Sequence, residues 1–234
     1  ARTIVGPIPF SRDGETIVSS ISDRKIKISQ IMECLSSQQR LVAGCIPKSV
    51  IESCDTLQIS YFDLMDNEEL TIFNTIATAE GAIAELIIRS DTNLHLSRCL
   101  VAGYGRCAKV LARKLEGLGV RVDILARSAI ARAEADTFGY QAYSFQEIDE
   151  GLPQYSFVFN TIPAAIFKEE ELKKLKKDVV LIDIASYPGG IDFVAAERLG
   201  KKAYLCLGLP GKYSPKSSAE AMAKVIEQYD LREK

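Results

Sequence analysis

Short runs of apolar and β-branched residues alternate with amphipathic stretches from residue 98 to the end of the chain. This alternation is typical of stacked βαβ units that build a parallel sheet. The pattern predicts six strands, at 98–102, 120–126, 140–144, 156–160, 179–184 and 202–206. It also predicts helices between and after them, at about 105–118, 129–138, 169–175, 193–199 and 215–229. We therefore expect an α/β fold with a doubly wound parallel sheet over 98–214.

Residues 1–97 carry a weaker pattern of the same kind. It predicts three strands and two helices, at 3–8, 41–46 and 56–60 and at 29–35 and 47–54. These elements indicate a partial second α/β domain over 1–74, on the substrate side. The stretch TIATAEGAIAELIIRS has apolar residues at three-to-four spacing and predicts a long helix over 75–89. This helix and the connector to residue 97 would join the domains, and a C-terminal helix over 215–234 can pack back on the first.

Composition narrows the classes of function. The chain has 29 Lys and Arg against 31 Asp and Glu, so its net charge of -2 provides no electropositive surface for nucleic acid. We find no apolar run near the roughly 20 residues that span a bilayer, and no leader sequence, so we expect a soluble, cytoplasmic protein without a membrane partner. The 6 cysteines form no CxxC pair and the single histidine, His95, lacks a second one nearby, so we expect free thiols and no metal site.

A GxGxxA motif, Gly103 to Ala108, lies between a predicted strand and a predicted helix. In dinucleotide-binding folds the first glycine permits a tight turn, the second lets the diphosphate approach the backbone, and the small third residue packs helix against strand. The helix start then offers unpaired N–H groups and a positive dipole to the phosphates. The motif predicts a Rossmann domain over 98–214. Its expected cofactor contacts are Gly103, Tyr104, Gly105, Arg106 and Cys107.

The second predicted strand lacks the acid that usually binds the adenosine ribose. Its only acid, Asp123, lies four residues before Arg127, roughly 13 Å away at about 3.3 Å per residue. Arg127 marks the strand end, between Ala126 and Ser128, and Arg132 follows one helical turn later. A guanidinium and a hydroxyl suit a 2′-phosphate, which an acid would repel. We predict NADP(H) rather than NAD(H), the alternative being that Arg127 is only a surface charge.

Three further strand ends should complete the cofactor crevice, because ligands collect at the carboxyl edge of such sheets. The fourth strand leads into NTIP, which would meet the cofactor near the nicotinamide ribose, although a plain Asx turn before the proline explains the same residues. The fifth leads into IDIASYPGG and the sixth into GLPGKYSPKS. The contacts predicted from these loops are Asn160, Thr161, Ile162, Pro163, Ala185, Gly208 and Pro210.

Three residues are candidates for catalytic chemistry. Lys216 lies in the first turn of the last predicted helix, where its charge opposes the helix dipole, and a bound substrate carboxylate would remove that conflict. Thr78 and Glu80 lie on the long joining helix, and Glu80 is a candidate base or proton relay. A solvated surface role is the alternative for both Lys216 and Glu80.

Several motifs occur in one order that resembles the A subunit of bacterial dipicolinate synthase. They are NTIATAEGAI (74–83), GYGRCAKVLA (103–112), ILARS (124–128), NTIP (160–163), IDIASYPGG followed by DF (182–193) and GLPGKYSPKS (208–217). Across 1–73 the resemblance rests mainly on GPIPFSRDG (6–14). Family members carry a further α/β segment ahead of this point, so the chain resembles a member without its amino-terminal portion. Tyr187 departs from the family pattern, which has an arginine that would supply charge to the substrate site.

The resemblance implies an NADP-dependent oxidoreductase. Together with a flavoprotein-like B subunit, such proteins oxidise dihydrodipicolinate to pyridine-2,6-dicarboxylate in the mother cell of a sporulating bacterium. Hydride passes to C4 of the nicotinamide while a base takes a proton, and the two substrate carboxylates need cationic or amide donors. The alternatives are a non-catalytic subunit that binds nucleotide and substrate, or another two-domain dehydrogenase of the kind that acts on shikimate or alanine. The sequence leaves the oligomeric state open, a homo-oligomer included.

Overall fold

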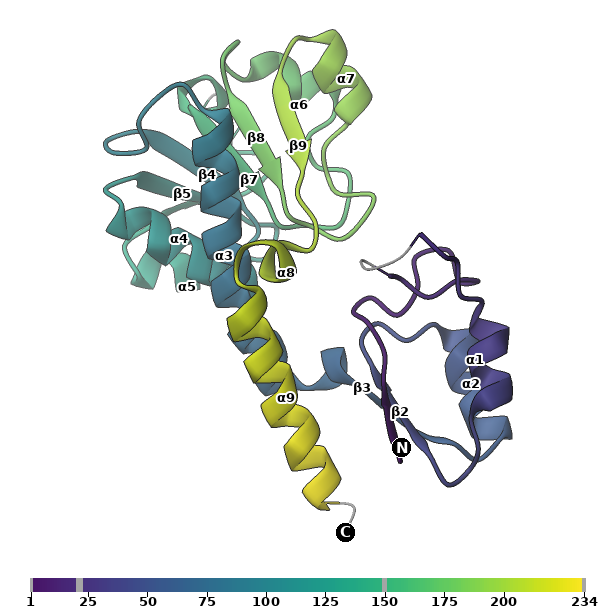
Figure 1. Ribbon diagram of the computed structural model, residues 1–234. Coiled ribbons are helices and arrows are strands. Elements are labelled where there is room, and N and C mark those ends of the chain that lie inside the picture. The colour runs from purple at the N-terminus through teal and green to yellow at the C-terminus, as the bar shows by residue number, and fades with distance from the viewer. Residues whose placement is uncertain (1, 20–22, 149–150, 233–234) are drawn as a thin grey trace. The chain divides into compact units, whose positions relative to one another are not determined.

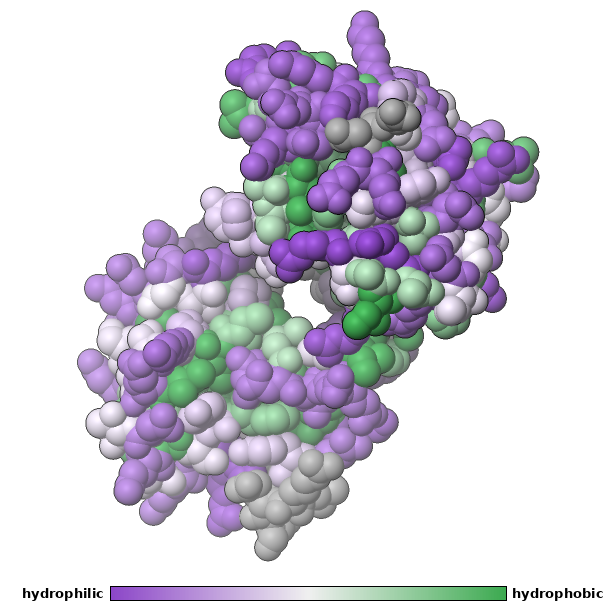
Figure 2. Space-filling view, turned by 180° about the vertical axis from the view of Figure 1, so that it is seen from behind, coloured by the Kyte–Doolittle hydropathy of each residue, from purple (hydrophilic) through white to green (hydrophobic). Residues whose placement is uncertain are grey.

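The computed structural model describes residues 2–19, 23–148 and 151–232 (Figure 1). The chain forms two compact units, the first from Ala1–Thr71 with Ala219–Lys234 and the second from Ile72–Ser218. It passes from the first unit to the second within helix α3 (Glu68–Arg89) and returns within helix α9 (Pro215–Arg232). On the face seen in Figure 2 hydrophilic side chains predominate and apolar side chains occur in small groups.

A six-stranded parallel sheet forms the centre of the second unit. Its strand order is β6-β5-β4-β7-β8-β9, so the order reverses between β4 and β7, where dinucleotide-binding folds open their ligand crevice. The strands are β4 (Arg98–Ala102), β5 (Arg121–Leu125), β6 (Gln141–Tyr143), β7 (Phe157–Asn160), β8 (Val180–Asp183) and β9 (Lys202–Leu205). Each of the six strands predicted over 98–206 is therefore present, and the doubly wound fold is confirmed.

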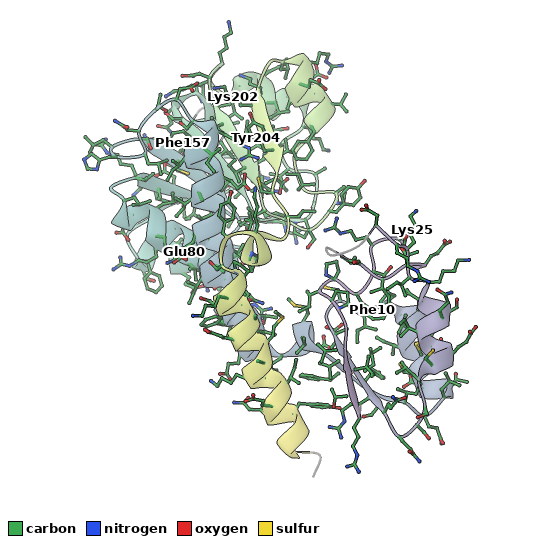
Figure 3. All side chains as sticks on the ribbon, viewed as in Figure 1. Phe10, Lys25, Glu80, Phe157, Lys202 and Tyr204 are labelled. Atoms are coloured by element: carbon green, nitrogen blue, oxygen red, sulfur yellow. The ribbon has the colours of Figure 1, made fainter. Side chains whose placement is uncertain are left out.

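Helices cover both faces of this sheet. One apolar core joins the sheet to α3, to α4 (Arg106–Gly117), to α5 (Ala129–Thr137) and to α8 (Leu209–Tyr213). A second core, on the other face, holds α6 (Glu169–Lys174), α7 (Phe193–Arg198) and the short η2 (Leu152–Gln154). Phe157, on β7, is one of the largest fully buried side chains (Figure 3). Helix α8 was not predicted, because its sequence LPGKY carries a proline and a glycine that indicate a loop.

The first unit has a smaller parallel sheet in the order β1-β2-β3. Its elements are β1 (Thr3–Val5), α1 (Ile28–Cys34), β2 (Arg40–Ala43), α2 (Lys48–Thr56), β3 (Ser60–Asp63) and η1 (Leu64–Asp66). Phe10 is buried in its core (Figure 3), and Tyr229 of α9 stacks on Phe62 of β3 with 4.4 Å between ring centroids. The strand predicted over 56–60 is wrong. Helix α2 extends to Thr56, and Gln58 takes a φ of 53°, which no strand accommodates.

Helix α3 begins seven residues earlier than predicted, so the expected boundary at 74/75 falls inside a helix. The start signal is Asn67, whose Oδ1 accepts from the backbone N–H of Leu70 at 2.8 Å. Glu68 and Glu69 then complement the positive end of the helix dipole. The helix therefore gains two turns ahead of the predicted start, and Asn67 with Glu68 and Glu69 forms its N-cap and first turn.

Among the described helices, α3 alone is long and apolar enough to cross a membrane, judged by length and composition. Its 22 residues include four glutamates and one arginine, so it is not an uninterrupted apolar run. Its buried residues explain the apolar composition, because Ala79, Ala82, Ile83 and Leu86 pack into the core against the sheet. The helix is a core element of the second unit.

Asp123 of β5 is buried and accepts two strong hydrogen bonds. Its Oδ2 atom accepts from Nε of Arg98 at 3.0 Å and from the hydroxyl of Tyr155 at 2.7 Å. Burial and the Asp123 carboxylate raise the pKa of Tyr155, so the phenol stays protonated and remains a donor. Asp123 therefore joins β4 and β5 to the segment before β7 and lies away from the nucleotide edge, as its place four residues before Arg127 predicts.

We predict that Asp123→Ala lowers the free energy of unfolding by about 3 kcal/mol, because it leaves the buried hydroxyl of Tyr155 without its acceptor and the guanidinium of Arg98 without its carboxylate partner. Urea denaturation followed by circular dichroism measures this. Asp91→Ala is the matched control, since it removes an exposed carboxylate paired with Lys202 at 2.7 Å. Its midpoint should stay at the wild-type value. Equal losses in the two variants would contradict the structural role of Asp123.

Candidate nucleotide-binding site

The three small residues of the GxGxxA motif occupy three different environments. Gly103 has a φ of 101°, and a Cβ placed there would lie 2.2 Å from Oγ1 of Thr161. Gly105 has a φ of -83°, and a Cβ there would meet no described atom within 4 Å. Ala108 is buried against the sheet. The first glycine is thus required by backbone and packing, whereas the second leaves open space above the backbone.

The start of α4 is suited to an anion. Gly105 is its N-cap residue and supplies no side-chain acceptor, and the first intrahelical bond runs from the N–H of Lys109 to the carbonyl of Gly105. The N–H groups of the first turn therefore face outward, together with the positive end of a 12-residue helix dipole. A diphosphate fits this position, because the space that a side chain at residue 105 would fill is open.

Two residues of the motif turn their side chains inward. The ring of Tyr104 packs edge-on against Tyr140, 6.3 Å between centroids, and the ammonium of Lys109 lies 5.4 Å from the Tyr104 ring centroid. The thiol of Cys107 is half-buried, and this burial raises its pKa. Tyr104 and Cys107 can therefore offer a cofactor only their backbone.

The turn after β5 separates the roles of the predicted 2′-phosphate residues. Nη1 of Arg132 donates to the carbonyls of Ala126 and Arg127, at 2.8 and 2.9 Å. Oγ of Ser128 accepts from the N–H of Ala131 at 3.4 Å and caps α5. These two side chains hold the turn. Arg127 is exposed, and its guanidinium makes no hydrogen bond or ion pair within the described part of the chain.

Asn160, at the end of β7, lies in the interior. Its Nδ2 donates to the carbonyl of Ile162 at 3.0 Å and to Oδ1 of Asp183 at 2.9 Å, and its Oδ1 accepts from the N–H of Ile162 at 3.1 Å. The residue is 0% exposed, so its side chain does not reach the cofactor edge. The Asx turn, which the sequence offered as the alternative, is the arrangement found. Asn160 positions the loop that carries Thr161, Ile162 and Pro163.

Asp183, at the end of β8, was not among the predicted residues, yet it organises this edge. It is fully buried and also accepts from the N–H groups of Ala185 at 3.0 Å and Gly190 at 2.7 Å. A Cβ at Gly189, which has a φ of 85°, would lie 2.6 Å from Asp183 Oδ2. The paired glycines were the available signal, because they permit this backbone to wrap around a buried carboxylate. Ala185 is buried here as well.

The three candidate catalytic residues are not brought together by any described contact. Glu80 accepts from Nζ of Lys114 on α4 at 2.8 Å, which pairs it with the neighbouring helix. Oγ1 of Thr78 donates to the carbonyl of Asn74 at 2.8 Å within α3. Lys216 is exposed in the first turn of α9. The structure therefore favours a structural role for Glu80 and Thr78 and leaves Lys216 at the surface.

The last predicted cofactor contacts lie after β9. Gly208 takes a left-handed conformation, with a φ of 67°, at the start of α8. Pro210 lies in the first turn of α8, and its carbonyl accepts from the N–H of Ser214 at 3.0 Å and from Oγ of Ser218 at 3.3 Å. These bonds connect α8 to the first turn of α9.

Comparison with known proteins agrees with this geometry. The family model described as "D-isomer specific 2-hydroxyacid dehydrogenase, NAD binding domain" matches residues 77–186. The A subunit of dipicolinate synthase from Bacillus subtilis is 31% identical over 222 residues, which cover 92% of this chain and 73% of that protein. The chain belongs to the family of dipicolinate synthase A subunits. The family expected from the order of the motifs is confirmed.

Two solved structures of dipicolinate synthase A subunits share the fold. The protein from Bacillus halodurans superposes with a TM-score of 0.88 at 28% identity, covering 97% of this chain and 79% of that one. The protein from Bacillus subtilis gives a TM-score of 0.87 at 26% identity, covering 99% and 78%. The second unit is thus a nicotinamide-dinucleotide-binding domain of the oxidoreductase type, within a member of this family.

We predict that Gly105→Ala weakens dinucleotide binding at least about tenfold, because its Cβ occupies the space beside the outward N–H groups of α4. The thermal unfolding midpoint should change little, since the φ of residue 105 suits alanine. Isothermal titration measures the affinity. Gly117→Ala, near the other end of α4, also places its Cβ in open space and should leave binding unchanged. Equal affinities for the wild type and both variants would contradict the assignment of the start of α4 as the dinucleotide-binding position.

Proposed function

We propose that this chain is the NADP-dependent subunit that oxidises dihydrodipicolinate to dipicolinate, and that its partner is a flavoprotein-like B subunit. The name of the Bacillus subtilis relative supports the product and the existence of a second subunit. The family model over 77–186 supports a nicotinamide cofactor. The finer choice of NADP over NAD rests on the end of β5.

The charge at the end of β5 favours a phosphorylated ribose. Arg127 projects from the turn while Arg132 and Ser128 hold the backbone beneath it. Residues 124–133 contain no acid, and Asp123 is buried in bonds to Arg98 and Tyr155. A ribose 2′-hydroxyl would find no carboxylate acceptor here, whereas a 2′-phosphate would find a guanidinium. This single cation is the observation that carries the choice of cofactor.

The bound nicotinamide would supply the hydride acceptor. The chain would hold the substrate and the cofactor in position and exclude water from the reacting atoms. The substrate loses a hydride and a proton, and its ring becomes aromatic. The loops after β7 and β8 are held rigid by Asn160 and Asp183, so they can fix the donor carbon against the acceptor ring. Lys216 is the cation that we assign to one substrate carboxylate.

We predict that Arg127→Ala raises the Kd of NADP+ about tenfold to a hundredfold and leaves that of NAD+ within about twofold, because one charge-assisted contact is lost. Thermal shift at matched cofactor concentrations gives the same comparison, since a ligand stabilises the folded protein according to its affinity. Arg121→Ala is the control, because Arg121 is an exposed arginine at the opposite end of the same strand. Wild-type protein that binds NAD+ and NADP+ equally would refute the role of Arg127.

Lys216→Ala should raise the KM for dihydrodipicolinate, and the Kd for dipicolinate, by about tenfold without changing the Kd for NADP+. The loss of one carboxylate contact is the reason. Lys224→Ala tests specificity, since Lys224 lies on the same helix and pairs with Glu69 at 3.2 Å. Steady-state turnover measured by NADPH absorbance, with and without the B subunit, reports these constants. If Lys216→Ala leaves the KM unchanged, Lys216 does not bind the substrate.

The same assay separates the proposed reaction from a second function. A protein that only binds nucleotide and substrate for the B subunit would show no turnover by itself, and the ion-paired Glu80 favours this reading because it leaves no evident base. Turnover by the isolated full-length protein excludes the binding role. NADP+ and dipicolinate binding without turnover, even in the presence of the B subunit, would contradict the proposed reaction.

A further inference from the structure

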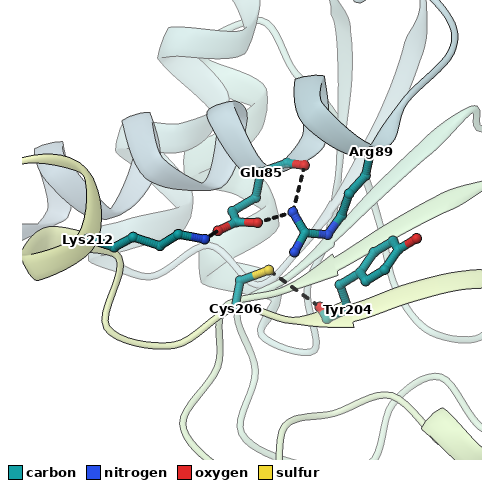
Figure 4. Close-up of polar contacts among 5 residues, drawn as sticks. All are labelled: Glu85, Arg89, Tyr204, Cys206 and Lys212. Atoms are coloured by element: carbon teal, nitrogen blue, oxygen red, sulfur yellow. Dashed lines mark hydrogen bonds and ion pairs between the residues drawn. The ribbon is translucent and has the colours of Figure 1, made fainter.

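A buried carboxylate joins α3 to α8 at the side of the large sheet (Figure 4). Glu85, on α3, is only 2% exposed. Its carboxylate pairs with the ammonium of Lys212 on α8 and with the guanidinium of Arg89, one turn further along α3. None of the predicted site residues belongs to this cluster, and two of its partners, Glu85 and Lys212, lie 127 positions apart in the sequence.

The surroundings of Glu85 leave it dependent on these two cations. The guanidinium of Arg89 lies 4.5 Å from the ring centroid of Tyr204 on β9, which fixes it beside the sheet. Burial raises the pKa of the neighbouring Cys206 thiol to about 11, so this side chain stays neutral. Burial also raises the pKa of Glu85, but its contacts with Lys212, Tyr213 and Arg89 outweigh this and lower the pKa below the ordinary value. The cluster therefore consists of one carboxylate held ionised by two cations.

Close packing brings α8 against α3 at the same point. A Cβ at Gly81 would lie 2.9 Å from Cβ of Leu209 and 2.9 Å from the ring of Tyr213, so only a glycine allows this approach. Leu209 is buried in the contact. Helix α8 has five residues, too few to be stable by itself, and its position depends on these contacts and on the ion pair.

The position of α8 determines that of Lys216. The N–H of Ser214 donates to the carbonyl of Pro210, and the N–H of Ser218 donates to the carbonyl of Ser214, both at 3.0 Å. Oγ of Ser218 donates to the Pro210 carbonyl as well. The first turn of α9, which carries Lys216, is therefore bonded directly to α8. A displacement of α8 would move Lys216 with it.

We propose that Glu85 is a positioning residue for the substrate site: through Lys212 it fixes α8, and α8 places Lys216 where a substrate carboxylate binds. This inference rests on the proposed function. It assigns to Glu85 and Lys212 no contact with the reacting atoms. Half of the Lys212 side chain is exposed, but its ammonium is paired with Glu85, so we assign it a structural role and no contact with substrate.

The test uses the chain together with the B subunit, in four variants: Glu85→Gln, Lys212→Met, Lys212→Arg, and Glu85→Gln with Lys212→Met. Lys212→Met should raise the KM for dihydrodipicolinate and the Kd for dipicolinate about tenfold, while the Kd for NADP+ and kcat change less than twofold. Lys212→Arg should restore the wild-type constants, because a guanidinium can still reach Glu85. The effects of the two changes on the substrate constants should not add in the double variant, since both remove the Glu85–Lys212 pair, although Glu85→Gln also removes the carboxylate that pairs with Arg89.

Lys202→Met provides the control, because Lys202 is a partly exposed lysine on β9 whose partner, Asp91, is exposed. It should leave all constants unchanged. The inference is overturned if Lys212→Met lowers the melting temperature yet leaves the substrate constants unchanged, since the pair would then serve stability alone. It is also overturned if the Kd for NADP+ rises as much as that for dipicolinate.

A separate measurement distinguishes failure of this inference from failure of the proposed function. If wild-type protein binds no dipicolinate, the proposed function fails. Hydrogen exchange of the amides in 209–218 then still tests whether the Glu85–Lys212 pair holds α8 in place. Faster exchange in Lys212→Met, with wild-type rates in Lys212→Arg and Lys202→Met, supports the positioning of α8 by Glu85. Unchanged exchange in Lys212→Met overturns it.

Discussion

The buried carboxylate of Asp183 is the constraint on which the carboxyl edge of the large sheet depends. An ionised group in the interior must be surrounded by donors, and here Asn160 and the N–H groups of Ala185 and Gly190 supply them. The Asn160 bond ties the end of β7 to the end of the neighbouring strand β8, and the other two bonds hold the loop after β8 around the same carboxylate. Gly189 and Gly190 are then required, because a side chain at either would collide with this network. The geometry offered to a cofactor is a consequence of satisfying one internal charge.

Much of the second unit could be predicted from sequence, since strands buried on both faces leave a clear signal. Strand β4 occupies the predicted residues, and β5 and β7 differ from the prediction by a single residue at most at each end. The motif at 103–108 was informative because both of its requirements are local: a positive φ at Gly103 and a small residue packed at Ala108. Requirements of this kind depend on a few consecutive residues, so a single sequence is enough to detect them. The family could be recognised for the same reason, from short motifs in order.

The features that sequence could not give are those that depend on distant partners. Asn160 looked like a ligand contact because its position at a strand end is the same whether it faces the cofactor or Asp183, 23 residues later. Glu85 looked like any other polar residue of an amphipathic helix until α8 was placed against it. Helix α8 itself contradicts local propensity and exists because Gly81 allows it to lie on α3. Glu80 is a candidate base when only the sequence is considered, whereas the structure pairs its carboxylate with Lys114 of the neighbouring helix.

The electrostatics around the end of β5 follow from how the neighbouring charges are paired. Asp123 is committed to Arg98 and Tyr155 inside the sheet, so its charge is compensated away from the edge. The first acid after the strand, Glu134, is bound by Lys109 at 2.6 Å. A charge that is already paired exerts a weak field on a ligand, whereas the field of an unpaired one is attenuated only by ionic screening, over a Debye length of about 8 Å at physiological salt. In the function proposed above, the preference for a 2′-phosphate at this edge then depends on Arg127, and a carboxylate brought close to it by mutation would oppose that phosphate.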